Sequence, residues 1–138
     1  MTLDVRHCTS DERDLATGLW TRCGLTRPWN DPAADFDLAL SSASSTVLGG
    51  FIGPKLIASV MVGFDGHRGW VYYVAVDQAD RGRGFGARMM QAAEMWLRDK
   101  GAPKLQFMVR EENGSALKFY TKLGFERQSV INLGRRLD

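Results

Sequence analysis

The chain has 138 residues, which is long enough for one domain, residues 1–138, with a sizeable hydrophobic core. Its 18 basic and 16 acidic residues leave a formal net charge of +2. Such a balance excludes the strong positive charge with which a protein attracts nucleic acid or a membrane surface. The two cysteines, Cys8 and Cys23, lack metal-ligand spacing and are typical of reduced thiols in a cytoplasmic protein. No stretch resembles a signal peptide or a membrane span.

The first 40 residues predict one strand and two helices. Residues 3–7 alternate between apolar and polar side chains, as in a strand near the edge of a sheet. A helix follows from an N-cap at Ser10, and the apolar side chains on one of its faces are Leu15, Leu19 and Cys23. A second helix begins at Pro32 with Asp31 as its N-cap. The connection between the helices contains Trp29, which either packs as a buried indole or lines a substrate mouth together with Asp31.

Three further strands are predicted to form an antiparallel meander. Residues 46–52 and 56–64 form a hairpin around the turn 53–55, and the turn 65–69 leads into residues 71–76. This last segment is an unbroken run of β-branched and aromatic residues, so it is predicted to be a buried central strand.

The second half predicts two helices and two strands. The first helix runs from Gly84 to Gly101, with an apolar stripe of Phe85, Met89, Ala92 and Trp96. Residues 104–110 follow as a strand parallel to the preceding one, because a helical crossover joins the two. A last helix begins at Asn113 and ends at Gly124, before a final strand at 125–132. The order β-α-α-β-β-β-α-β-α-β predicts an α/β fold with a single mixed β-sheet flanked by helices.

The loop between residues 71–76 and the next helix has the features of a phosphate-binding site. Residues 81–86 read RGRGFG, and their three glycines allow consecutive backbone amides to face one point. The unpaired amides and the dipole of the first helical turn favour an anion there. Such loops also occur as tight connections without a ligand. The glycine spacing fits neither a dinucleotide-binding fingerprint nor a nucleotide P-loop.

Two motifs resemble one known family. The pattern R-x-x-G-x-G at 81–86, after a strand that ends at Val76 and Asp77, resembles the acyl-coenzyme A loop of the GNAT superfamily of N-acetyltransferases. Residues 113–125 are similar to the family's segment N-x-x-A-x-x-F-Y-x-x-x-G-F. The predicted element order is also that of the family. Short matches at 27–32, 65–69 and 134–137 resemble a YpeA-like bacterial branch.

The resemblance implies that an acetyl group is transferred from acetyl-CoA to a primary amine by direct attack in a ternary complex, without a metal. It places Tyr120 as the general acid that protonates the departing thiolate; without the resemblance, Tyr120 reads as a core aromatic. Asn113 and the backbone of Val74 and Val76 would contact pantetheine. The residues expected to hold the pyrophosphate are Arg81, Gly82, Arg83, Gly84, Phe85 and Gly86.

The resemblance fails at the general base. Positions where many family members carry a glutamate hold Trp70 and Met108, and neither side chain accepts a proton. Neutralising a lysine-type amine of pKa about 10.4 at pH 7 costs roughly 4.6 kcal/mol, whereas an α-amine of pKa near 7.8 costs only about 1.1. The acceptor is therefore an easily deprotonated amine, or the base lies elsewhere. Candidates for such a base, each also readable as a surface or turn residue, are Asp31, Asp65, His67 and Glu111.

The acceptor side is predicted to combine aromatic and acidic residues, which would suit a cationic or aromatic amine, either a small molecule or a peptide. The residues assigned to it are Trp29, Asp31, Asp65, His67 and Tyr72, with Trp70 and Tyr73 as further aromatic candidates. Formation of a homodimer stays open. The alternative function is a non-catalytic acyl-CoA-binding or sensor module on the same fold, which the missing glutamates favour.

Overall fold

A computed structural model of the chain describes residues 2–138 in two compact units, one ending at Phe107 and the other spanning Met108–Asp138. The first unit contains a five-stranded sheet in the order β1-β2-β3-β4-β5. Its strands are β1 Asp4–His7, β2 Ser45–Ile52, β3 Lys55–Phe64, β4 Gly69–Val76 and β5 Leu105–Gln106. Its α-helices are α1 Arg13–Arg22, α2 Pro32–Ser41 and α3 Phe85–Lys100. The second unit contains α4, Gly114–Lys122. The predicted α/β class with a mixed sheet is confirmed.

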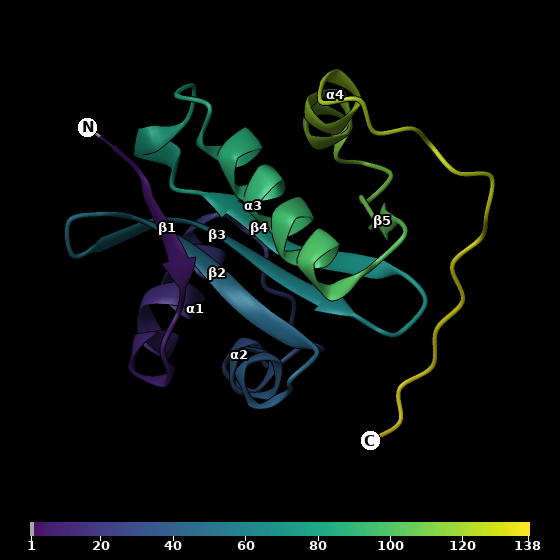
Figure 1. Cartoon of the computed structure of the whole chain (residues 1–138), viewed down its shortest axis with the longest axis horizontal. Coiled ribbons are helices and arrows are strands. Elements are labelled where there is room, and N and C mark those ends of the chain that lie inside the picture. The colour runs from purple at the N-terminus through teal and green to yellow at the C-terminus, as the bar shows by residue number, and fades with distance from the viewer. Residues whose placement is uncertain (1) are drawn as a thin grey trace. The chain divides into compact units, whose positions relative to one another are not determined.

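The sheet is covered by helices on both faces (Figure 1). Strands β1 to β4 are antiparallel, whereas β5 runs parallel to β4, as expected after the helical crossover through α3. The core beneath α1 and α2 includes Trp20 and Phe36, both fully buried. On the other face α3 packs closely against the sheet. A Cβ atom at Gly69 would lie only 2.5 Å from the Leu97 side chain, so the absence of a side chain at Gly69 permits this close approach.

Several helix ends follow the sequence signals. The Asp31 carboxylate accepts a hydrogen bond from the Ala34 amide at 3.1 Å and caps α2, with Pro32 as the first helical residue. Helix α3 lies between Gly84 and Gly101, which adopt left-handed conformations with φ of 79° and 83°. The predicted caps of both helices are therefore confirmed.

The predicted apolar faces of α1 and α3 are wrong by about one position. A 3₁₀ turn, Ser10–Glu12, precedes α1, and Thr9 rather than Ser10 is its first cap residue. Which face of a helix is buried depends on how the helix packs against the sheet, and the spacing of apolar residues alone does not fix it to one position. Leu15 is 45% exposed. The buried residues are Ala16, Leu19 and Trp20 in α1, and Met89, Met90, Ala93 and Leu97 in α3.

The second half of the sheet is shorter than predicted. Residues 104–110 contribute only the two residues of β5. The final strand expected at 125–132 is wrong, since this segment is irregular backbone and the Ile131 side chain is 88% exposed. Apolar alternation produces a strand only where a partner ladder is available. Strand β4 lies between β3 and the short edge strand β5. The prediction that β4 is the central strand is therefore corrected, because β3 holds the central position.

Cys8 and Cys23 are free thiols, as predicted. Burial raises the pKa of the Cys8 thiol to about 12, which leaves it protonated and unreactive at neutral pH. No helix within residues 2–138 is long and apolar enough to cross a membrane.

Candidate active site

The turn that joins β4 to α3 forms a cradle of backbone amides. Gly82 and Gly84 have φ of 82° and 79°, conformations that side chains with a Cβ atom rarely adopt. Apart from chain neighbours, no described heavy atom lies within 4 Å of the position that a Cβ would take at either glycine. Gly84 is the N-cap and offers no side chain to the amides of the first helical turn. The loop therefore fits a phosphate group, which such amides bind.

Side chains brace this loop against the end of β4. Arg81 Nε donates to the carbonyl oxygen of Val76 at 3.1 Å, and Arg83 Nη1 lies 3.7 Å from Asp80 Oδ1. From α1, Arg22 Nη2 donates to Asp77 Oδ2 at 3.0 Å. The two loop arginines thus remain exposed at the cradle while acidic or carbonyl oxygens orient them.

Beyond Trp70 the outer edge of β4 is open within the first unit. The β4–β5 ladder contains two pairs, Gly69 with Leu105 and Trp70 with Gln106. The Asp77 amide donates to the Ile57 carbonyl of β3 at 2.7 Å. Because successive backbone groups of a strand face alternate edges, the backbone N–H of Val76 faces away from β3. The resemblance to the family assigns this N–H to pantetheine.

The second unit contains Tyr120 on α4 and Asn113 at the N-cap of this helix. The rings of Phe119 and Phe125 pack edge-on against Tyr120, with centroids 5.0 and 6.2 Å away. Burial raises the pKa of the Tyr120 phenol to about 12, so it is protonated at neutral pH, as a general acid must be. Asn113 Oδ1 accepts from the Ala116 amide at 3.2 Å and caps α4, so Asn113 also has a structural role.

Asp65 and its neighbours gather at the turn between β3 and β4. Asp65 Oδ1 accepts from the backbone amides of Arg68 at 2.7 Å and His67 at 2.8 Å. Its other oxygen accepts from the indole Nε1 of Trp70 at 3.1 Å. These hydrogen bonds, above all those from the two amides, lower the pKa of Asp65. A carboxylate held in this way is a weak base, and its main role is to shape the turn.

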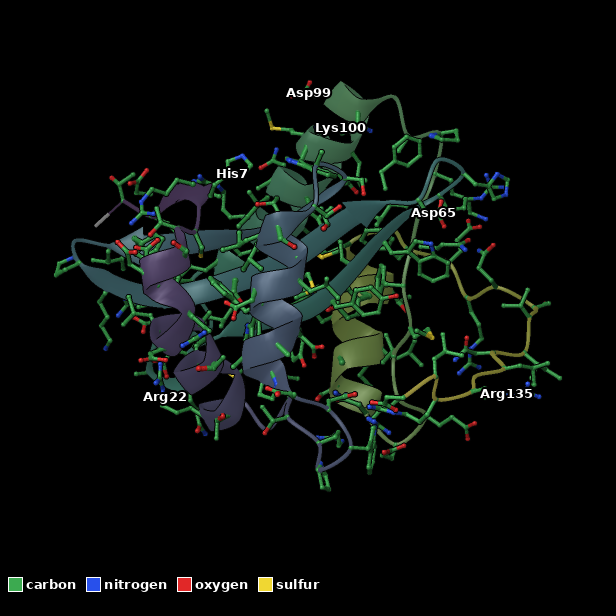
Figure 2. All side chains as sticks on the ribbon, turned by 90° about the horizontal axis from the view of Figure 1, so that it is seen from below. His7, Arg22, Asp65, Asp99, Lys100 and Arg135 are labelled. Carbon is green, nitrogen blue, oxygen red and sulfur yellow. The ribbon has the colours of Figure 1, made fainter. Side chains whose placement is uncertain are left out.

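The predicted acceptor residues fall into two groups. Asp65 and His67 lie in the β3–β4 turn, and the 45% exposed Tyr72 lies in the first half of β4. Burial, together with the charge of Asp65, raises the pKa of Tyr72. Trp29 and Asp31 belong to the connection between α1 and α2, where Trp29 is 54% exposed. Figure 2 shows Asp65 well apart from Arg22, which marks the end of β4 that carries the amide cradle.

Sequence reasoning missed a contact between α2 and β4. The Tyr73 hydroxyl donates to Asp35 Oδ2 at 2.7 Å. The two residues are 38 positions apart, and Asp35 reads in the sequence as an ordinary helix-surface acid. Only the packing of α2 over the sheet reveals this pair, and no sequence signal would have found it.

An amide cradle at a helix N-terminus, directly after β4, fits the phosphate and the extended arm of a cofactor such as coenzyme A. The acetyltransferase (GNAT) family matches residues 8–125, and the chain belongs to this family. The prediction of an acetyl-CoA-dependent N-acetyltransferase is confirmed.

Two relatives agree with this assignment, and two solved structures share the fold. An acetyltransferase of Yersinia enterocolitica is 43% identical over 135 residues, which cover 98% of this chain and 96% of the relative. An acetyltransferase of Pectobacterium atrosepticum is 38% identical with the same coverage. The structure of the aminoglycoside N-acetyltransferase AAC(6')-Iy with a CoA bisubstrate analogue has a TM-score of 0.85 at 17% identity, covering 99% of each chain. Ribosomal-protein-alanine N-acetyltransferase from Brucella melitensis has a TM-score of 0.79 at 15% identity, covering 99% of this chain and all of the other.

Proposed function

We propose that the protein transfers the acetyl group of acetyl-CoA to a primary amine by direct attack in a ternary complex. The observation that carries the proposal is the amide cradle at residues 82–86, placed directly after the open edge of β4. A phosphate at the cradle and an extended arm along the edge require these two features next to each other. Relatives named acetyltransferase, at about 40% identity, support the reaction class.

Two parts of coenzyme A, the pyrophosphate and the pantetheine arm, have proposed partners in this chain. The amides from Arg81 to Gly86 hold the pyrophosphate, with Arg81 and Arg83 adding positive charge. The backbone N–H groups of Val74 and Val76 pair with pantetheine, in place of the missing part of β5. Asn113 contacts the same arm through its Nδ2, since its Oδ1 caps α4.

The reaction itself needs few groups. The amine nitrogen attacks the thioester carbonyl carbon, a C–N bond forms, and a backbone amide of β4 near Val76 stabilises the oxyanion. The C–S bond then breaks, and Tyr120 gives its proton to the departing thiolate and regains one from solvent. Its raised pKa keeps the phenol protonated until that step. The amine releases its own proton to water or to a side-chain base.

The acceptor that we propose is an amine of pKa near 8. Among the candidate bases Asp65 is disfavoured, because the hydrogen bonds that shape its turn lower its pKa. An amine of pKa near 7.8 needs only about 1.1 kcal/mol for deprotonation at pH 7. Neighbours of the same fold act on an aminoglycoside in one case and a ribosomal protein in another, so a small molecule and a peptide are both suitable classes. A homodimer and a cytoplasmic location stay predictions.

One experiment separates the enzyme from the alternative, a binding or sensor module. Acetyl-CoA affinity is measured by calorimetry, and CoA release is followed with a thiol reagent during incubation with amines of graded pKa. We expect binding together with amine-dependent CoA release. Binding without release from any amine would favour the sensor, and absence of binding would contradict both readings.

A further inference from the structure

The phenol of Tyr73 lies on the face of the sheet that α1 and α2 cover. Its ring stacks on the indole of Trp20 in α1, with centroids 3.9 Å apart and an angle of 9° between the planes. Its hydroxyl donates to Asp35 Oδ2 in α2 at 2.7 Å. Helix α3, whose N-terminus carries the amide cradle, covers the other face (Figure 1). The phenol therefore extends from β4 away from the helix that is proposed to hold the pyrophosphate.

The phenol and the carboxylate are held in place by the core. Trp20 is fully buried, and its Nε1 donates to Oγ of the equally buried Ser59 at 2.9 Å. The indole on which the Tyr73 ring stacks is thus itself fixed. Asp35 lies one helical turn after the N-cap of α2, next to the fully buried Phe36. A donor and an acceptor held at hydrogen-bond distance are the geometry that proton transfer between two side chains requires.

The environment keeps the Tyr73 phenol protonated. Burial and the hydrogen bond to Asp35 raise its pKa, and the charges of Asp35 and Asp31 add to the shift. A phenol that donates to a carboxylate still has oxygen lone pairs with which to accept another hydrogen bond. Neither partner is sealed in the core, because Tyr73 and Asp35 are both only half-buried. The phenol oxygen can therefore accept from a substrate group while its own proton points at Asp35.

The proposed reaction needs such an acceptor after the amine has attacked. An amine of pKa near 8 loses its first proton to solvent at little cost. When the neutral nitrogen bonds to the acetyl carbon, it becomes positively charged and carries a second proton to be removed. While it keeps that proton, the nitrogen remains a good leaving group and the intermediate returns to reactants. Trp70 and Met108, at the positions of the family's glutamates, cannot take this proton.

We propose that Tyr73 and Asp35 form a relay that removes this second proton. Tyr73 is the catalytic residue, and Asp35 acts through it. The N–H bond of the attacking nitrogen breaks as a proton joins Tyr73 Oη, whose own proton passes to Asp35 Oδ2. The phenol remains neutral, and Asp35 then releases the proton to solvent. The inference rests on the proposed function, which places the thioester along β4, the strand that carries Tyr73.

The test compares substitutions that change the relay with one that does not. Tyr73→Phe removes the phenol oxygen and keeps the ring stack. Asp35→Asn keeps the shape and an oxygen that accepts from Tyr73, but it removes the carboxylate, whereas Asp35→Glu keeps a carboxylate and changes the shape. The matched control is Asp37→Asn, two residues further along α2. It makes the same chemical change at a carboxylate that accepts from Arg13 Nη1 at 2.9 Å.

The acceptors are alaninamide, an α-amine, and butylamine, a lysine-type amine, both at high concentration. Release of CoA at saturating acetyl-CoA gives kcat, and calorimetry gives the acetyl-CoA Kd. Tyr73→Phe and Asp35→Asn should each lower kcat by on the order of a hundredfold, the scale of a placed acid or base, with the Kd unchanged. Asp37→Asn should behave as the wild type. Asp35→Glu should be faster than Asp35→Asn, whereas a purely structural role would give the opposite order, because asparagine is the better mimic of shape.

Four outcomes would overturn the inference. A wild-type kcat in either Tyr73→Phe or Asp35→Asn would show that the proton leaves by another route. An Asp35→Glu variant no faster than Asp35→Asn would reduce Asp35 to a structural role, and an equal loss in Asp37→Asn would assign the effect to the stability of α2. These three results leave the proposed function standing. A wild type that binds acetyl-CoA and releases no CoA with either amine would refute the proposed function, and the inference with it.

Discussion

A valine at Gly84 tests the amide cradle most directly. Gly84 has φ of 79°, a conformation that costs a residue with a Cβ atom about 1–2 kcal/mol. Each kcal/mol lowers Tm by about 4 °C in a chain of this size. The new side chain would also occupy the open space above the loop, where a phosphate oxygen is expected. Loss of one hydrogen bond to a charged group costs about 1.5–3 kcal/mol, or roughly tenfold to a hundredfold in Kd.

Gly101 provides the matched control at the other end of the same helix. Its φ is 83°, and no described heavy atom beyond its chain neighbours lies within 4 Å of its Cβ position. Gly101→Val therefore carries the same backbone strain without touching the cradle. Thermal denaturation followed by circular dichroism should give similar losses of Tm for the two variants. Calorimetry with coenzyme A should give a weaker Kd for Gly84→Val alone.

The comparison has a clear refuting result. Equal coenzyme A affinity for Gly84→Val and Gly101→Val, with both variants folded, would mean that the loop does not bind the pyrophosphate. The assignment of residues 81–86 would then be wrong, although membership of the family would remain.

Three further predictions concern the acid, the acceptor and the pH dependence of stability. Tyr120→Phe should lower kcat by on the order of a hundredfold and leave the acetyl-CoA Kd unchanged; a wild-type kcat would return Tyr120 to a packing role. At pH 7 and equal binding, amines of pKa near 8 should react faster than lysine-type amines, and the reverse order would reveal a base that was overlooked. Hydrogen bonds from Arg6 lower the pKa of Glu12 from 4.5 to about 2, so the stability that this carboxylate contributes is present above pH 4.5 and lost as the pH falls toward 2. Glu12→Gln should therefore lower Tm at pH 7 but not at pH 2, and a difference in Tm that persists at pH 2 would contradict this linkage.

The features that the sequence predicted well depend on neighbouring residues. A cap such as Asp31 or Gly101 acts on amides or carbonyls a few positions away, so adjacent residues are enough to predict it. The same holds for the glycine-rich loop, whose amides belong to one short segment. The family assignment rested on two such segments, 81–86 and 113–125, and it is confirmed.

Tertiary packing decided what local patterns leave open. The faces of α1 and α3 shifted, and residues 125–132 formed no strand, because burial and pairing depend on distant partners. Only the packed structure revealed that, within the first unit, β5 pairs with just the first two residues of β4. The Tyr73–Asp35 and Trp20–Ser59 hydrogen bonds join residues 38 and 39 positions apart, and their geometry is set when α1 and α2 pack on the sheet. A one-dimensional pattern carries no information about such distances, which is why these hydrogen bonds were found only in three dimensions.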